Sequence, residues 1–319
     1  MQPVLQSILV VGGNGFIGSA VCKAALARGI KVTSISSSGR PYRTPKGHTP
    51  AWVSEVKWQK ANALQPETYA DILPGVNGVV HTLGTLLENG QYKKAMADGD
   101  IGALISNFLS GLVDSGNPLE KGGDGTQEGY EALNRDSALR VCETFLSTPP
   151  SVQSVGPRPF VYVSAEDIFR PFISAKYIDT KREAEQHIEN MIFDKLDYRG
   201  VYIRPSLVYH PHHRPITSPV AALLDLSASL HSNAPSNIPT PSRILRSLSS
   251  AFSPAEGSSL DSIANALTIP PIHVEHVAEA ICAALDPARE VRGVVDVRRM
   301  RELIGWSERS RPSTTHAQS

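Results

Sequence analysis

Two side chains that could transfer a proton, Tyr177 and Lys181, stand in the stretch YIDTKREAE. Four residues make about one helical turn, so a helix here would place the phenol and the amine on one face. A positive charge beside a phenol favours the ionised phenol, which would let Tyr177 exchange a proton at moderate pH. Because such a pair also arises by chance, its interpretation depends on the elements that would position it.

A glycine-rich turn near the start of the chain gives the first support. Gly12, Gly15 and Gly18 form GxxGxxG between the apolar stretch ILVV and an amphipathic helix. Such a turn lets the backbone approach a diphosphate, which then lies at a helix N-terminus where free N–H groups and the helix dipole favour negative charge. We expect dinucleotide binding; the alternative is a tight turn that is merely structural. The expected contacts in this turn are Gly12, Asn14, Gly15, Phe16, Ile17 and Gly18.

The end of the second predicted strand bears on which dinucleotide binds. An NAD site usually has a carboxylate there, which accepts a hydrogen bond from the ribose 2′-hydroxyl. The sequence reads SISSSGRPYR and has no acid, whereas Ser36, Ser38 and Arg40 could hold a 2′-phosphate. This pattern favours NADP(H) over NAD(H); a solvated loop with an incidental charge is the alternative.

Strands and helices alternate along most of the chain. The alternation predicts an α/β fold with a doubly wound parallel sheet of the Rossmann type and a small C-terminal substrate lobe. Strands are expected within 8–11, 30–36, 56–61, 78–84, 159–165, 200–209 and 291–297, and helices within 66–73, 103–112, 131–146, around Tyr177 and before 285.

The composition divides the chain into four parts. Residues 1–210 would form the NAD(P)-binding domain, and 211–269 a Ser/Pro-rich insertion or substrate lobe with two short amphipathic helices. Residues 270–306 would return to the Rossmann domain or C-terminal lobe, and 307–319 would be a disordered tail. The insertion could cover an apolar pocket, lie on a membrane surface or be a flexible surface loop.

Composition also excludes several classes of protein. Lys+Arg and Asp+Glu are equal at 31 each, which argues against a nucleic-acid partner. No apolar run is long enough to span a bilayer. The three cysteines fit no metal spacing, and the HPHH run has no companion ligands, so no metal site is expected. Only MQPVLQS precedes the first strand, so no N-terminal presequence is visible.

These ordered motifs resemble the short-chain dehydrogenase/reductase superfamily, in its extended or atypical branch of NAD-dependent epimerase/dehydratase-like proteins. The resemblance covers most of residues 7–210 and resumes at 270–297. It is carried by GGNGFIG, VVHTLG, LNRDSA, VYVSA, the Tyr-Lys pair and IRPSLVY. The resemblance implies a catalytic set of Ser164, Tyr177 and Lys181 supported by Asn134, in which the serine would bind the substrate oxygen and the lysine the nicotinamide ribose.

The same resemblance implies further contacts with the dinucleotide. These would come from Asn62, His81, Leu83, Gly84, Lys181, Arg204 and Pro205. Two residues depart from the family pattern, because Asn62 stands where an aspartate is common and Ser206 where glycine is commoner. Adenine recognition by Asn62 would therefore be weaker.

Three longer stretches are similar to a group of fungal mitochondrial proteins associated with the coenzyme Q biosynthetic complex. They are WVSEVKWQKANALQPETYADIL, VVHTLGTLLENGQYKKAM and YVSAEDIFRPFISAKYIDTKREAE. That group is itself related to the nucleotide-binding accessory subunit of respiratory complex I. The similarity implies a mitochondrial protein on the matrix side of the inner membrane, partnered by a lipid-biosynthetic complex, that acts in or regulates ubiquinone synthesis.

Two functions remain open from the sequence. The Ser-Tyr-Lys set favours an NADP(H)-dependent oxidoreductase that acts by hydride transfer on a hydrophobic or quinone-type small molecule. The atypical branch favours a non-catalytic nucleotide-binding accessory subunit of a mitochondrial membrane-associated complex. Epimerase chemistry on a sugar nucleotide is a weaker hypothesis, because the sequence identifies no nucleotide-sugar site.

Overall fold

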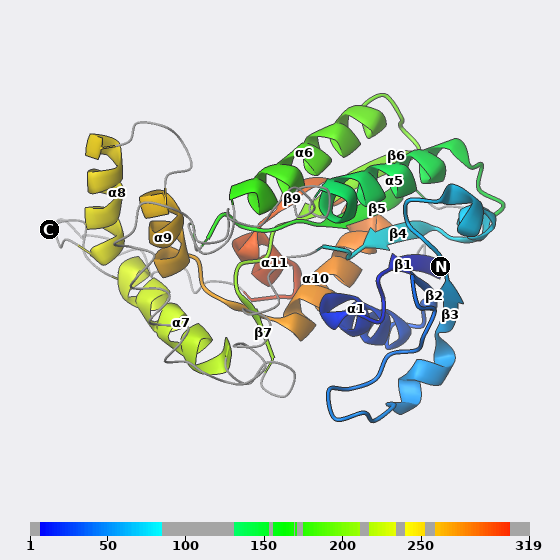
Figure 1. Ribbon diagram of the computed structural model, residues 1–319, viewed down its shortest axis with the longest axis horizontal. Helices are drawn as coiled ribbons and strands as arrows, with labels where there is room; N and C mark the ends of the chain where they lie inside the picture. Colours follow the sequence, from blue (N-terminus) through cyan, green and yellow to red (C-terminus); the bar gives the residue numbers. More distant parts are fainter. Residues whose placement is uncertain are drawn as a thin grey trace, which may run out of the picture.

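The chain folds around a parallel sheet. A computed structural model describes residues 7–84, 131–152, 156–168, 170, 175–210, 217–233, 240–252 and 259–306. In these ranges seven parallel strands pair in the order β3-β2-β1-β4-β5-β6-β9 (Figure 1). The strands are β1 Ser7–Val11, β2 Lys31–Ser36, β3 Lys57–Lys60, β4 Gly78–His81, β5 Arg158–Val163, β6 Tyr198–Ile203 and β9 Gly293–Val295. The prediction of a doubly wound, Rossmann-type α/β fold is confirmed.

Helices cover both faces of the sheet (Figure 1). On one face α1 (Phe16–Leu26) packs against α10 (Val274–Leu285), and Val21, Val277 and Ile281 lie fully buried against β1 and β6. On the other face α5 (Ser137–Ser147) and α6 (Ala175–Ile192) pack together over β4 and β5. The strands between these layers are almost entirely apolar, as a parallel sheet buried on both faces requires.

The strand order reverses at β1, and this reversal fixes where a ligand can bind. β1 pairs with β2 on one side and with β4 on the other. The connections that leave β1 and β4 therefore diverge at the carboxyl end of the sheet. Ligands of doubly wound sheets bind at such a switch point, and here the glycine turn occupies it.

A separate group of helices lies beside the sheet in Figure 1. Helix α9 (Ser259–Thr268) packs against both α7 (Thr217–Asn233) and α8 (Pro241–Phe252). The two-residue strands β7 (Val208–Tyr209) and β8 (Ile272–His273) pair where the chain leaves and re-enters the Rossmann layers. Among the helices that the structure describes, none combines the length and hydropathy needed to cross a membrane.

Some predicted elements were wrong in detail. The helix expected within 66–73 is a pair of 3-10 helices, Pro66–Thr68 and Ala70–Gly75, because two prolines bracket a segment too short for a stable α-helix. The strand expected within 200–209 divides into β6 and β7 around Pro205, which has no N–H for the ladder.

Other elements were not predicted or fall outside the described ranges. The sequence analysis did not predict α9, nor α11 (Val297–Leu303), which begins at Asp296 with a side-chain cap to the N–H of Arg299. The helix expected within 103–112, residues His212 and His213, and the tail 307–319 lie outside the described residues.

Candidate functional site

The glycine turn connects β1 to α1 in a conformation that needs glycine at positions 12 and 18. Gly12 has φ of 86°, in the left-handed region that favours glycine, and its carbonyl accepts a 2.9 Å hydrogen bond from the Gly15 N–H. A Cβ on Gly18 would lie 2.2 Å from the Gly12 carbonyl oxygen, so the helix can start this close to the strand only with glycine there. Gly15 is exposed at the N-cap, and Phe16 and Ile17 form the first turn of α1. This geometry fits a diphosphate at the N-terminus of α1.

The loop after β2 lies against this turn. The Asn14 amide nitrogen donates to Ser38 Oγ at 3.3 Å and to the Arg40 carbonyl at 3.4 Å. Ser36 Oγ accepts from the Gly39 N–H at 3.1 Å, which orders the start of the loop. Arg40 is exposed. The structure thus brings the Ser38 hydroxyl and the Arg40 backbone beside the turn, and their binding of a ribose phosphate stays a prediction.

The end of β4 links the glycine turn to Lys181. Thr82 Oγ1 donates to the Val11 carbonyl at 2.8 Å, and a Cβ on Gly12 would lie 2.8 Å from the Leu83 side chain. The Leu83 carbonyl in turn accepts a 3.1 Å hydrogen bond from Lys181 Nζ. These contacts therefore hold the glycine turn and the Lys181 amine at the same edge of the sheet.

The Lys181 side chain is held by several contacts at this edge. It is buried, and its Nζ also donates to the Val163 carbonyl at 2.9 Å and lies 4.6 Å from the centroid of the Tyr162 ring. Burial lowers the pKa of Lys181 to about 7, and the Glu185 carboxylate opposes this shift. The amine can therefore gain or lose a proton near neutral pH.

Asn134 and Gly84 lie next to the lysine amine. A Cβ on Gly84 would lie 2.8 Å from Lys181 Nζ and 3.1 Å from Asn134 Oδ1. Asn134 is fully buried in a π-helical turn, Glu131–Asp136, and its carbonyl accepts a hydrogen bond from the Tyr162 hydroxyl. π-Helical turns occur frequently at functional sites. Of the predicted catalytic set, Asn134 and Lys181 thus meet at the end of β4.

Tyr177 and Ser164 complete the predicted set. Tyr177 is half-buried one helical turn before Lys181 on α6. Ser164 follows β5 and is buried, but its hydroxyl accepts a 3.3 Å hydrogen bond from Arg182. The serine hydroxyl is therefore held by a charged side chain of α6.

Glu185 is the centre of this charged network. Its carboxylate accepts hydrogen bonds from Arg182 at 2.7 Å and from the Arg204 Nε at 3.0 and 3.1 Å. Burial opposes its ionisation, but hydrogen bonds from Arg204 and Ser164 and the charge of Arg182 lower the pKa of Glu185. Sequence reasoning missed this residue, although its position four residues after Lys181 placed it on the same helical face.

Several predicted cofactor contacts have hydrogen-bond or ion-pair partners within the protein, and their contact with a cofactor stays a prediction. The Asn62 carboxamide oxygen accepts from the Leu64 N–H at 3.1 Å and closes a turn after β3. His81 is fully buried, with Nε2 3.2 Å from Ser137 Oγ. Burial and the Lys181 charge lower its pKa to about 3, so the His81 side chain is neutral. Arg204 is paired with Glu185, and the Pro205 carbonyl accepts from the Glu166 N–H at 2.9 Å.

A cavity of about 690 Å³ opens at the same carboxyl edge of the sheet, beyond Ser164. It is lined by Glu166, Thr268–Pro270, Asp296–Arg298, Arg301, Glu302 and Trp306. Burial raises the pKa of Glu166, while Arg182 and Arg204 oppose this shift. Sequence reasoning missed Glu166, even though it follows Ser164 by two residues just beyond a strand end.

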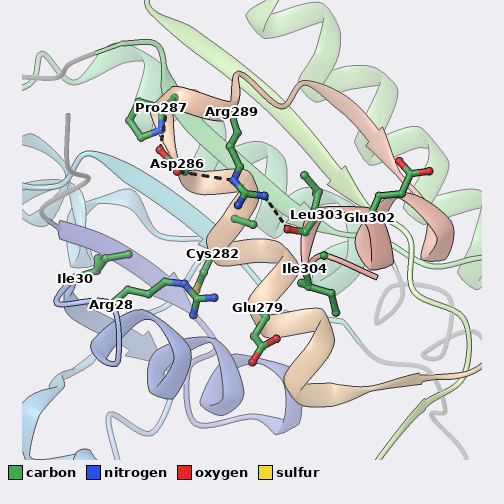
Figure 2. A pocket seen from close by; sticks show the side chains of 13 residues that line it. Arg28, Ile30, Glu279, Cys282, Asp286, Pro287, Arg289, Glu302, Leu303 and Ile304 are labelled. Atoms are coloured by element: carbon green, nitrogen blue, oxygen red, sulfur yellow. Dashed lines mark hydrogen bonds and ion pairs between the residues drawn. The ribbon is translucent and has the colours of Figure 1, made fainter. Parts of the chain in front are cut away.

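A second cavity, of about 560 Å³, lies elsewhere (Figure 2). It is bounded by Arg28 and Ile30 beyond the C-terminal end of α1, by Glu279 and Cys282 of α10, and by Arg289. Arg289 donates to the Leu303 carbonyl at 2.7 Å and faces Asp286. Because the glycine turn is at the opposite end of α1, and none of the predicted site residues lines this cavity, we do not assign the site to it.

The fold and the site together define a dinucleotide-binding protein of the Rossmann type. Comparisons with known proteins agree. The NAD dependent epimerase/dehydratase family matches residues 8–127. The chain is 32% identical over 218 residues to MIOREX complex component 2 of Saccharomyces cerevisiae, covering 67% of this chain and 76% of the yeast protein.

Solved structures show the same fold. A short-chain dehydrogenase/reductase of the glucose/ribitol dehydrogenase type from Brucella melitensis superposes with a TM-score of 0.56 at 13% identity, covering 93% of this chain and 96% of that one. UDP-glucuronic acid 4-epimerase from Bacillus cereus, in complex with NAD, gives 0.50 at 16% identity over 92% and 76% of the two chains. The chain belongs to the NAD dependent epimerase/dehydratase family, which binds nicotinamide dinucleotides.

The exposed glycine at the start of α1 provides a test of the binding site. Gly15 has φ of −80°, which any residue adopts, and an added Cβ would meet only the Gly12 carbonyl at 3.2 Å. Gly15→Ala should therefore keep the fold but place a methyl group at the N-terminus of α1. We expect NADPH, measured by fluorescence titration, to bind on the order of tenfold more weakly.

Gly75→Ala is the matched control, because an added Cβ there meets nothing within 4 Å. It should leave the affinity unchanged. Equal affinity of the Gly15→Ala protein and the unsubstituted protein would contradict the assignment of the diphosphate to this turn.

The buried amine predicts a pH dependence of stability. Between the folded pKa of Lys181 near 7 and the unfolded value of 10.5, the unfolded chain binds a proton that the folded chain does not. The free energy of unfolding should therefore rise with pH through this window, and Lys181→Met should abolish that contribution, which is on the order of 1.4 kcal/mol per pH unit.

Urea denaturation of the two proteins from pH 7 to pH 10 measures the difference. The free energy of unfolding of Lys181→Met should exceed that of the unsubstituted protein by less and less as the pH rises. Lys195→Met, at a side chain 43% exposed, is the control for removing a lysine that is not buried. A difference that stays constant with pH would show that Lys181 is charged throughout.

Proposed function

We propose that this protein is an NADP(H)-dependent oxidoreductase that acts by hydride transfer in mitochondrial ubiquinone biosynthesis. Its substrate would be a hydrophobic carbonyl compound or a quinone-type intermediate. The observation that carries the proposal is the position of Lys181, whose amine is fixed by the Leu83 and Val163 carbonyls at the edge of the sheet that holds the glycine turn.

The residues at this edge have distinct tasks in the proposal. The bound dinucleotide would supply the hydride chemistry. Lys181 would bind the nicotinamide ribose and, with a pKa near 7, would accept or supply a proton close to Tyr177. Tyr177 would exchange the proton with the substrate oxygen, and Asn134 would keep Lys181 in place from the neighbouring π-helical turn.

The cavity beyond Ser164 is the candidate substrate site. Ile269, Pro270, Val297 and Trp306 give it an apolar part, which suits a hydrophobic substrate. Glu166 borders it at the end of β5, where burial raises its pKa and Arg182 and Arg204 oppose that shift.

A second candidate function is supported by the hydrogen bond that already holds the Ser164 hydroxyl. The hydroxyl accepts this hydrogen bond from Arg182, which holds it toward α6 and would have to release it before it could turn to a substrate oxygen. A nucleotide-binding accessory subunit would need no such release. The yeast relative is named as a component of a complex, which suits this alternative.

The placement in the cell is part of the same proposal. The resemblance to fungal mitochondrial proteins of the coenzyme Q complex supports a mitochondrial protein on the matrix side of the inner membrane. Similarity to a component of the MIOREX complex supports a partner complex there. We propose residues 1–210 and 270–306 as the nucleotide-binding unit, and 211–269 as the unit that meets substrate or partner.

Changing Tyr177 discriminates the two functions. In cells that depend on the protein, Tyr177→Phe should reduce ubiquinone content at least tenfold if the phenol transfers a proton, because phenylalanine cannot do so. NADPH affinity of the purified variant should be unchanged. Tyr198→Phe, which alters a buried tyrosine hydrogen-bonded to Arg158, is the control. Normal ubiquinone content with Tyr177→Phe would support the accessory subunit instead.

Arg40 tests the preference for NADP(H). If its guanidinium binds the 2′-phosphate, Arg40→Ala should weaken NADPH binding roughly tenfold and leave NADH binding unaltered, since NADH lacks that group. Arg43→Ala, three residues further on the same exposed loop, should change neither affinity. Parallel titrations that show equal losses for both dinucleotides, or none, would refute the preference.

A further inference from the structure

A short segment joins Ser164, which follows β5, to Tyr177 on α6, and both are members of the predicted catalytic set. Its residues 164–168 form neither helix nor strand. Because buried backbone N–H and C=O groups need hydrogen-bond partners, neighbouring elements must position such a segment. On one side the chain after β6 does so, since the Glu166 N–H donates to the Pro205 carbonyl at 2.9 Å. The partners on the other side therefore bear on the site.

Helix α9 supplies the partners on the other side. The Asn265 carboxamide nitrogen donates to the Asp167 carbonyl at 3.2 Å, and the Arg170 N–H donates to Ser262 Oγ at 2.8 Å. Ser262 is 1% exposed, so water does not compete for its hydroxyl. Asn265 and Ser262 are three residues apart and lie on the same face of the helix. One face of α9 thus binds two backbone groups of the segment.

The Arg170 side chain carries this contact to α6. Its Nε donates to the Asp167 carboxylate at 2.9 Å, and its guanidinium lies 3.5 Å from the carboxylate of Asp179. The Arg170 side chain is only 15% exposed, so it is held in this position. Asp179 follows Tyr177 by two residues in the first half of α6. The residue whose backbone α9 binds is therefore also paired with the helical turn that carries Tyr177.

The Asn265 side chain is bound at both ends. Its Oδ1 accepts a 3.2 Å hydrogen bond from Arg246 of α8, while its Nδ2 donates to the Asp167 carbonyl. A carboxamide whose oxygen and nitrogen both have partners is fixed in one orientation. The position of α8 thus reaches the segment through a single side chain of α9.

Ser206 provides a third contact between the same two regions. It stands at a position where the sequence resemblance favours glycine, and its buried hydroxyl donates to the Pro270 carbonyl at 2.6 Å. Pro270 lies just after α9 and lines the cavity beyond Ser164. Helix α9 and the residues that follow it are therefore bound to the chain after β5 and to the chain after β6.

We propose that Asn265 and Ser262 are positioning residues, which place Tyr177 by holding the segment after Ser164 against α9. The helices α7 to α9 then set the geometry of the site, although they contribute no group to the reaction. The inference rests on the proposed function for the task of Tyr177. It adds a route by which the C-terminal helices control that task, from Arg246 through Asn265 to the segment and α6.

Fluorine NMR of the full chain tests the proposal without an assay of activity. The chain has nine tyrosines, so protein labelled with 3-fluorotyrosine gives nine fluorine signals. The signal of Tyr177 is the one that disappears in Tyr177→Phe. Its chemical shift reports the surroundings of the phenol, which a purely structural role of α9 would not alter.

Two substitutions break the contacts one at a time. Ser262→Ala removes the acceptor of the Arg170 N–H, and Asn265→Asp keeps the shape of the side chain and its acceptor oxygen but removes the donor to the segment. Each should move the Tyr177 signal by more than its line width. In Ser262→Ala the hydrogen exchange of the Arg170 amide should also accelerate about tenfold, because the amide loses its hydrogen bond.

Ser242→Ala is the matched control. Ser242 is buried to the same degree as Ser262, at 2% exposed, and its Oγ lies 2.7 Å from His231 Nδ1. This contact joins α8 to α7 and not to the segment. Ser242→Ala should therefore leave both the Tyr177 signal and the exchange of the Arg170 amide unchanged. Thermal unfolding shows that each variant is folded.

Two results would overturn the proposal. One is a Tyr177 signal that moves in neither Ser262→Ala nor Asn265→Asp, which would leave α9 a packing role alone. The other is an equal movement in Ser242→Ala, because any loosening of the helices would then suffice. Failure of the proposed function is separable: normal ubiquinone content with Tyr177→Phe would refute hydride transfer, while movement of the Tyr177 signal would still establish the positioning.

Discussion

The burial of the Lys181 amine is the constraint on which the rest of the site depends. An ammonium group removed from water is costly unless polar groups replace the lost hydration. Here the Leu83 and Val163 carbonyls and the face of the Tyr162 ring do so. These partners belong to the ends of β4 and β5, so the amine can be accommodated only when both strands and α6 are in register. The site is therefore formed by the same contacts that close the sheet.

A second constraint couples the two sides of the site. Glu185 lies one turn after Lys181 on α6, and its charge opposes the effect of burial on the lysine. The same carboxylate binds Arg182 and Arg204, and Arg182 in turn donates to the Ser164 hydroxyl. The surroundings of the Lys181 amine and the position of Ser164 therefore both depend on Glu185.

The parts of the site that the sequence predicted are those set by local repeats. The strand–turn–helix pattern around Gly12, Gly15 and Gly18 determines where a diphosphate can approach, and the helical repeat places Tyr177 and Lys181 on one face. The partners of Lys181 could not be predicted in this way, because Leu83 is 98 residues away in the chain. Which strand ends lie next to each other depends on the order of the strands in the sheet. A local repeat of apolar residues in the sequence does not encode that order.

The C-terminal helices show a different limit of the sequence pattern. The periodicity of α7 and α8 correctly indicates amphipathic helices, but it does not say which face points inward. The packing of the three helices decides this: Ala221 and Ala228 of α7 are buried, whereas Leu223, Leu226 and Leu230 of the same helix are exposed. Ser227 of α7 donates a 3.1 Å hydrogen bond to the Leu267 carbonyl of α9, one residue before Thr268 of the cavity lining. The packing of α7 on α9 therefore also positions one wall of the cavity beyond Ser164.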